Sequence, residues 1–136
     1  MTSDPRYVLD TSVLVSAVLL PQSIPRQAVD RAFAQGIVLA SAATIAEVDE
    51  VLHRHKFDRY LNEEDRLLFL VAFIRKVTLV DVNEHLAICR DAKDNKFLEL
   101  AVSGSANCIV SGDSDLLILN PFRGIAIITP HEFVKC

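Results

Sequence analysis

Short apolar runs separated by stretches of helical spacing constrain the fold of this chain more than any other feature. The runs predict strands at residues 7–9, 37–40, 78–82, 108–110 and 125–128. Strands that alternate with helices join through right-handed crossovers into a parallel sheet covered by helices on both faces. The pattern therefore predicts an α/β fold of three layers, α/β/α, with a central parallel sheet of about five strands.

Residues that favour helix starts mark the expected helices. Thr11 and Ser12 are expected to cap a helix over residues 13–20, Ser41 a second helix and Asn62 a third. In the second helix the apolar stripe consists of Ile45, Val48, Val51 and Leu52, and in the third the predicted buried side consists of Leu67, Leu68, Val71 and Ile74. Pro130 predicts a last helical turn at the end of the chain.

The length and composition indicate one globular domain over residues 1–136. The longest apolar stretch, residues 13–20, is too short for a membrane span, and no basic leader precedes it. We therefore expect a cytoplasmic protein without a membrane partner. The net charge of -4 disfavours a nucleic-acid binder that works through a basic surface, but it is compatible with an enzyme whose acids hold metal ions.

Two acids stand at the ends of predicted strands, Asp10 directly after the first strand and Asp113 three residues after the fourth. Asp10 and Asp113 stand where parallel sheets bind ligands, although Asp is also common in turns. Asp94 stands at the head of a helix, where capping is the alternative role. Glu47 and Asp49 lie on opposite margins of one apolar stripe, and spacing does not choose between them.

Carboxylates brought together in one site would repel one another unless a divalent cation neutralised them. Magnesium suits such a site because it prefers oxygen ligands, whereas zinc usually recruits histidine or cysteine. The four histidines and three cysteines show no ligand-like spacing. The sequence therefore predicts a magnesium site.

Several segments resemble those of a known family. They read VLDTSVLVSAVL at 8–19, ATIAEVDEVLHRHKF at 43–57, RDAKDNKFLELAVSGSA at 90–106, IVSGDSDLLIL at 109–119 and PFRGIAIITPHEFV at 121–134. Together they cover nearly the whole chain, which resembles the PIN domain, and most closely the bacterial PIN proteins that act as toxins of toxin–antitoxin pairs. Two departures are Ser12, where relatives often have Asn, and Ala92, where many have Pro.

The resemblance implies a set of site residues and an activity. The catalytic acids and metal ligands would be Asp10, Glu47, Asp94 and Asp113, with Asp115 as a further metal ligand and Asp91 as an additional candidate. The resemblance selects Glu47 over Asp49. It also implies Mg²⁺ or Mn²⁺ as the cofactor and the hydrolysis of RNA as the reaction, and we expect the RNA to be single-stranded. A homodimer and an antitoxin partner are also expected.

Polar and basic residues near these acids are candidate substrate contacts. The hydroxyls of Thr11 and Ser111 could bind a ligand, although both could simply serve the turns they occupy. The candidate phosphate contacts are Lys93 and Lys96, with Arg54, Lys56, Arg90 and Arg123 as further candidates. A solvated charged surface is the alternative for each of them.

Three other readings compete with a ribonuclease. A phosphatase of the haloacid dehalogenase type needs a second Asp two residues after the first, where this chain has Ser12. A receiver domain would need neighbouring acids before the first strand-end Asp. A catalytically weak PIN-fold module that binds RNA or protein is the third reading, and the presence of all four acids favours an enzyme over it.

Overall fold

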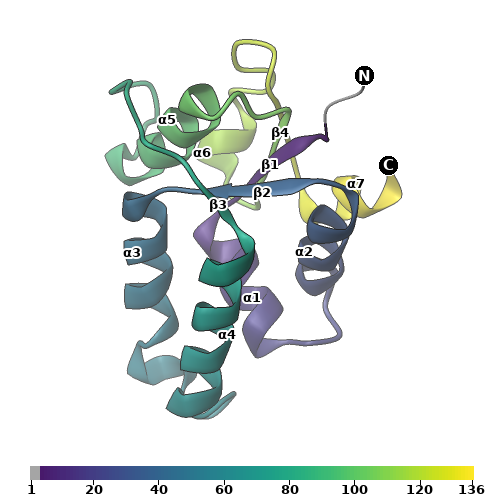
Figure 1. Cartoon of the computed structure of the whole chain (residues 1–136), viewed down its shortest axis with the longest axis vertical. Helices are drawn as coiled ribbons and strands as arrows, with labels where there is room; N and C mark the ends of the chain where they lie inside the picture. The colour runs from purple at the N-terminus through teal and green to yellow at the C-terminus, as the bar shows by residue number, and fades with distance from the viewer. Residues whose placement is uncertain (1–3) are drawn as a thin grey trace.

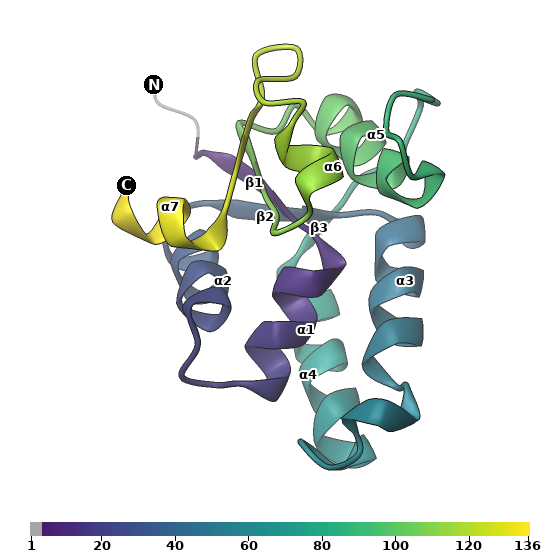
Figure 2. The ribbon, with the colours of Figure 1, turned by 180° about the vertical axis from the view of Figure 1, so that it is seen from behind.

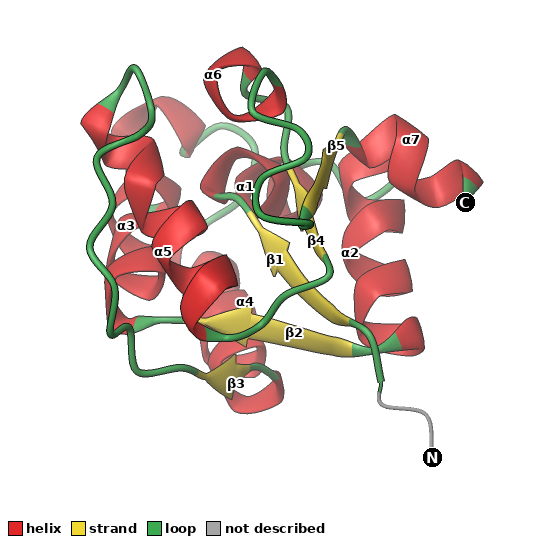
Figure 3. Cartoon of the chain, turned by 90° about the horizontal axis from the view of Figure 1, so that it is seen from above, coloured by secondary structure: helices red, strands yellow, loops and turns green. Residues whose placement is uncertain are grey.

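The computed structural model describes residues 4–136, so the first three residues of the expected domain lie outside the described part. Within that part a five-stranded parallel sheet has the order β3-β2-β1-β4-β5 (Figure 3). The strands are β1 (Arg6–Leu9), β2 (Ile37–Ala40), β3 (Thr78–Leu79), β4 (Cys108–Val110) and β5 (Ala126–Ile128). The predicted α/β fold with its central parallel sheet is confirmed.

Helices cover both faces of the sheet (Figures 1 and 2). One face packs on α1 (Thr11–Leu19), α2 (Ile24–Gln35), α3 (Ala42–Leu52), α4 (Glu63–Lys76) and α7 (Pro130–Lys135), and the other on α5 (Asn95–Ser103) and α6 (Ser114–Leu117). Successive strand residues point to opposite faces. In β1, Tyr7 and Leu9 enter the first core and Val8 enters the second.

The helix starts largely follow the expected capping residues. The side chains of Ser41 and Asn62 cap α3 and α4 as predicted. The prediction for α1 was wrong, because Asp10 is the cap and Thr11 and Ser12 already lie within the helix. An Asp that ends a strand can itself accept the free amides of the helix that follows, so no intervening residue is needed.

The third strand is shorter than predicted. Only two residues, Thr78–Leu79, pair with β2 at the edge of the sheet, and residues 80–88 have no regular structure. Side chains of α5 accept the backbone amides of this segment instead. Asn83 donates to Ser103, Leu86 to Glu99, and both Ile88 and Cys89 to Asn95.

The predicted buried side of α4 was also wrong. Leu67 and Leu68 are 52% and 60% exposed, and Val71 and Ile74 are also exposed. The side that packs on the core carries Arg66, Leu70 and Phe73. Helical spacing gives α4 two apolar stripes, and spacing alone does not say which of them faces the core. Arg66 is buried because its guanidinium donates to the carbonyl of Leu52 at 3.0 Å and to the carboxylate of Asp58 at 2.7 Å.

Candidate active site at the carboxyl ends of the central strands

Asp10 and Asp113 come from neighbouring strands at the centre of the sheet. β1 pairs with β4 in a register that sets Leu9 opposite Val110, and the amide of Asp10 donates to the carbonyl of Val110 at 3.1 Å. Asp10 directly follows β1, and Asp113 lies three residues beyond the end of β4. The two acids therefore reach the same edge of the sheet.

Ser111 connects these two acids. Its hydroxyl donates to Oδ2 of Asp10 and accepts from the amide of Asp113. Oδ1 of Asp10 accepts from the Ser12 hydroxyl and from the amide of Val13, both at 2.9 Å. Ser111 is fully buried, so the structure gives it a role in holding the two acids and no open surface for the substrate contact that the sequence suggested.

The environment of Asp10 acts on its ionisation in two opposing ways. Burial raises the pKa of Asp10, whereas the hydrogen bonds from Ser111 and Val13 lower it. The charge of Asp113 adds to the rise in the pKa of Asp10.

Three carboxylates form a tight group at this edge. One oxygen each of Asp94, Asp113 and Asp115 lies within 4.8 Å of the others. Asp113 caps α6 and accepts from the amide of Asp115 at 2.8 Å. Asp94 precedes α5, at the end of the 3₁₀ turn Ala92–Asp94, but its side chain forms no capping hydrogen bond.

The free oxygen of Asp94 fits a cation. Among the described residues, Oδ2 of Asp94 is the buried side-chain atom without a hydrogen-bond partner. Burial, followed by the charge of Asp113, raises the pKa of Asp94 to about 7. A buried carboxylate oxygen that has no donor and faces two further carboxylates is the environment that a hard divalent cation would satisfy.

Replacing Asp94 with Asn should therefore stabilise the metal-free protein, and more so at pH 8 than at pH 5. The pKa of Asp94 is raised on folding, so its favourable contribution is complete at low pH and is lost as the pH rises through about 7. The Asn side chain does not titrate. Thermal unfolding of both proteins in chelator at the two pH values measures the difference, and an equal shift in melting temperature at both would contradict it.

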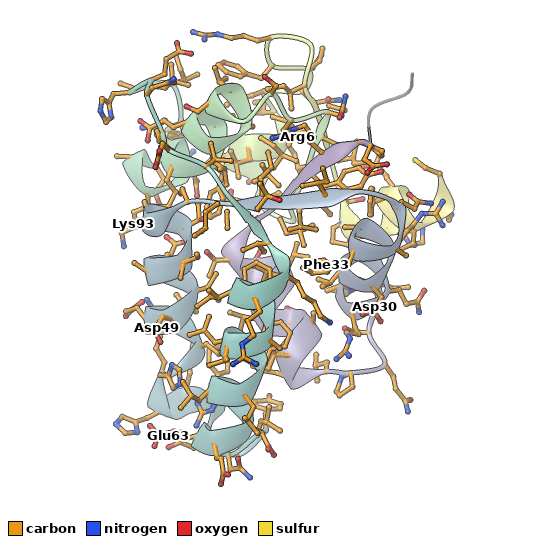
Figure 4. All side chains as sticks on the ribbon, in the orientation of Figure 1. Arg6, Asp30, Phe33, Asp49, Glu63 and Lys93 are labelled. Carbon is orange, nitrogen blue, oxygen red and sulfur yellow. The ribbon has the colours of Figure 1, made fainter. Side chains whose placement is uncertain are left out.

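Glu47 lies on the inner margin of α3 and is held by the chain itself. The Thr11 hydroxyl donates to Oε2 of Glu47, and Nζ of Lys96 lies 2.6 Å from Oε1. Asp49 points outward from the same helix (Figure 4) and pairs with His53 at 3.1 Å. The structure thus brings Glu47 and not Asp49 toward the strand ends, although neither Glu47 nor Asp10 belongs to the group within 4.8 Å.

The basic candidates divide between the site and the rest of the surface. Lys96 contacts Glu47, and the largely exposed Arg90 lies 3.8 Å from Asp115. Lys93 is exposed on the turn before Asp94 (Figure 4). The others have partners elsewhere. Arg54 pairs with Glu50, and Arg123 pairs with Glu84. Lys56 lies over the ring of Phe57. The additional acidic candidate, Asp91, caps the 3₁₀ turn by accepting from the amide of Lys93.

Comparison with known proteins identifies the family. A model of the PIN domain matches residues 6–115, so the chain belongs to the PIN-domain family. It is 34% identical over 140 residues to the uncharacterized protein MJ1680 of Methanocaldococcus jannaschii, an alignment that covers 96% of this chain and 90% of that protein. Membership of this family supports a nuclease as the role of the chain.

Solved structures share the fold at low sequence identity. VapBC2 from Rickettsia felis, bound to a DNA fragment from its promoter, has a TM-score of 0.63 at 13% identity, covering 91% of this chain and 98% of that one. PAE2754 from Pyrobaculum aerophilum has a TM-score of 0.58 at 14% identity, and the match covers 96% of this chain and 88% of that one. FitAcB from Neisseria gonorrhoeae has a TM-score of 0.57 at 20% identity, and the match covers 92% of this chain and 98% of that one.

Within residues 4–136, none of the helices combines the length and the apolar character that a membrane span requires.

Proposed function

We propose that this chain is a metal-dependent endoribonuclease that hydrolyses phosphodiester bonds in single-stranded RNA. The observation that carries the proposal is the unpartnered, buried Oδ2 of Asp94 beside Asp113 and Asp115. Family membership supports nuclease chemistry, and three clustered carboxylates supply the oxygen ligands that Mg²⁺ or Mn²⁺ prefers.

Asp94, Asp113 and Asp115 would hold the ion, and Asp10 and Glu47 complete the acidic site. When bound, a divalent ion lowers the pKa of a coordinated water and stabilises charge on a phosphate group. The chain supplies the orientation, because Ser12 and Ser111 fix both oxygens of Asp10.

Basic side chains at the rim would bind the RNA backbone. Lys93 and Arg90 are exposed on the segment that leads to Asp94, whereas Lys96, two residues after it, is paired with Glu47. Contacts to phosphate carry no information about base sequence but set the register of the strand on the enzyme. We infer that this rim positions RNA while the acids carry the chemistry.

Millimolar Mn²⁺ or Mg²⁺ should raise the melting temperature and switch on cleavage of a single-stranded RNA. A ligand that binds only the folded state stabilises it in proportion to the logarithm of its concentration. Thermal unfolding and a cleavage assay, each with metal and with chelator, measure the two effects. Unchanged melting together with RNA retained in chelator but never cut would instead favour the binding module.

An antitoxin is the proposed protein partner. Support comes from the structural likeness to VapBC2 and FitAcB and from a groove that begins beside the acids at Ser12 and is lined by Val15, Leu19, Phe57 and Tyr60. An amphipathic antitoxin segment fits it, because its apolar residues would cover the groove while an Arg or Lys enters the acidic site. Co-purification with the product of a small adjacent gene would test this, and the absence of any such gene would count against it.

A second copy of the chain is the proposed partner of α4. Its exposed apolar stripe, formed by Leu67, Leu68, Val71 and Ile74, lies between an acidic first turn and a basic last turn. Two such helices packed antiparallel about a twofold axis would bury both stripes and set the acidic first turn of one copy near the basic last turn of the other, because these turns flank the stripe.

Replacing Val71 with Glu should therefore convert a dimeric wild-type protein into a monomer, because each interface would bury two unpaired carboxylates. Light scattering during size-exclusion chromatography gives the mass. The matched control is Ala34→Glu, which adds the same charge to an exposed position of α2 and should leave the dimer intact. A monomeric wild-type protein would remove this part of the proposal.

A further inference from the structure

The carboxylate of Glu47 is the acid of the site that is paired with a partly buried cation of the chain. Nζ of Lys96 lies 2.6 Å from Oε1, and the two side chains are only 22% and 21% exposed. Oε2 accepts from the hydroxyl of Thr11, which is buried. Both oxygens of Glu47 are therefore occupied by donors of the chain itself.

This pair differs from an ordinary surface ion pair. Arg54 and Glu50, by contrast, are 46% and 62% exposed and lie one helical turn apart. Lys96 and Glu47 come from α5 and α3, on opposite faces of the sheet, and their contact closes the gap between these helices at the edge where the strands end. Partial burial weakens solvent screening, so an ion pair in this position interacts more strongly than an exposed one.

The other half of the site has no comparable cation. The oxygens of Asp94, Asp113 and Asp115 lie within 4.8 Å of one another, and Oδ2 of Asp94 has no partner. The nearest basic group is the side chain of Arg90, which is 90% exposed and lies 3.8 Å from Asp115. The site is thus divided into a half neutralised by Lys96 and a half that still needs a cation.

We propose that Lys96 is the built-in cation of the Glu47 half, so that this chain takes a single divalent ion, held by Asp94, Asp113 and Asp115. The inference rests on the proposed function and specifies its metal content. A second ion at Glu47 would have to displace the ammonium of Lys96 and the hydroxyl of Thr11. Lys96 acts through Glu47 and is therefore a positioning residue.

Counting bound Mn²⁺ tests this inference directly, since the spin-resonance signal of free Mn²⁺ gives the number of ions bound per chain without any measurement of cleavage. Wild type should bind one ion. Lys96→Met, which keeps the apolar stem and removes the charge, should bind two, because Glu47 is then free. Lys96→Arg restores a cation and should return the number to one, and the double variant Lys96→Met with Glu47→Gln should also bind one.

The outcomes separate this inference from the proposed function. No binding of Mn²⁺ by wild type would overturn both. Two ions bound by wild type, or one ion bound by Lys96→Met, would overturn the single-ion inference alone and leave the metal-dependent nuclease standing. Circular dichroism checks folding, and Lys96→Gln takes the place of Lys96→Met if that variant does not fold.

Discussion

Replacement of Asp113 with Asn should reduce RNA cleavage by at least about a hundredfold while the protein stays folded. The loss follows because stabilisation of the reacting phosphate through a metal is worth several kcal/mol, and about 1.4 kcal/mol corresponds to tenfold in rate. Asn keeps an oxygen for the amide of Asp115, which Asp113 holds at 2.8 Å, so the cap of α6 survives. Cleavage of a single-stranded RNA in manganese, with folding checked by circular dichroism, measures the effect.

Two comparisons sharpen this experiment. Asp10→Asn should also reduce cleavage strongly, but with some loss of stability, because the NH₂ group that replaces Oδ2 cannot accept the hydrogen bond that Ser111 donates there. Asp49→Asn should leave cleavage unchanged, since Asp49 points away from the site. Undiminished cleavage by folded Asp113→Asn and Asp10→Asn would show that these acids only form turns.

Replacement of Arg66 with Ala should cost about 3 kcal/mol of unfolding free energy, because it leaves a cavity and removes the hydrogen bonds of the guanidinium, among them the one to the buried carbonyl of Leu52. The side chain is 1% exposed, and it joins α4 to the end of α3 through the carbonyl of Leu52 and to Asp58 in the connection between them. For a chain of this length the loss corresponds to about 10 °C in melting temperature. Thermal and urea unfolding measure it.

The control for this prediction is Arg54→Ala. Arg54 belongs to the same region, but it forms an exposed pair with Glu50 one helical turn away, so its loss should cost about 0.5 kcal/mol or less. Arg66→Lys should fall between the two, because one ammonium group cannot reach all the acceptors of the guanidinium. Equal stability of Arg66→Ala and Arg54→Ala would show that the buried contacts of Arg66 contribute little.

The sequence predicted the sheet well because strand identity depends on local signals. Apolar runs bounded by capping residues locate β2 and β4 at the predicted positions. The edge strand β3 was predicted three residues too long, because β2 ends at Ala40 and pairing with it stops once the amide of Val80 has donated to the carbonyl of Ala40. The burial of α4 was misjudged for a related reason, since helical spacing finds stripes but cannot tell which one faces the core.

The candidate site was predictable at the level of residue types and only partly in its contacts. Strand ends pointed to Asp10 and Asp113, and the structure brings them to one edge. Spacing left Glu47 and Asp49 equivalent, because the choice depends on where α3 lies relative to Thr11 and Lys96. The contact of Lys96 with Glu47 joins residues 49 positions apart, a separation that no local pattern encodes.

The hydrogen bonds between α5 and residues 83–89 have a consequence for how the site can change. Three side chains of one helix, Asn95, Glu99 and Ser103, hold this segment, which has no strand pairing of its own. Any shift of α5 therefore carries Asp94, Lys96 and residues 83–89 together, whereas Asp10 and Asp113 stay with β1 and β4. Asp94 is thus positioned by a helix and its attached segment, and Asp10 and Asp113 by the strand ends. Substitutions along α5 are therefore expected to affect the position of Asp94 more than that of Asp10 or Asp113.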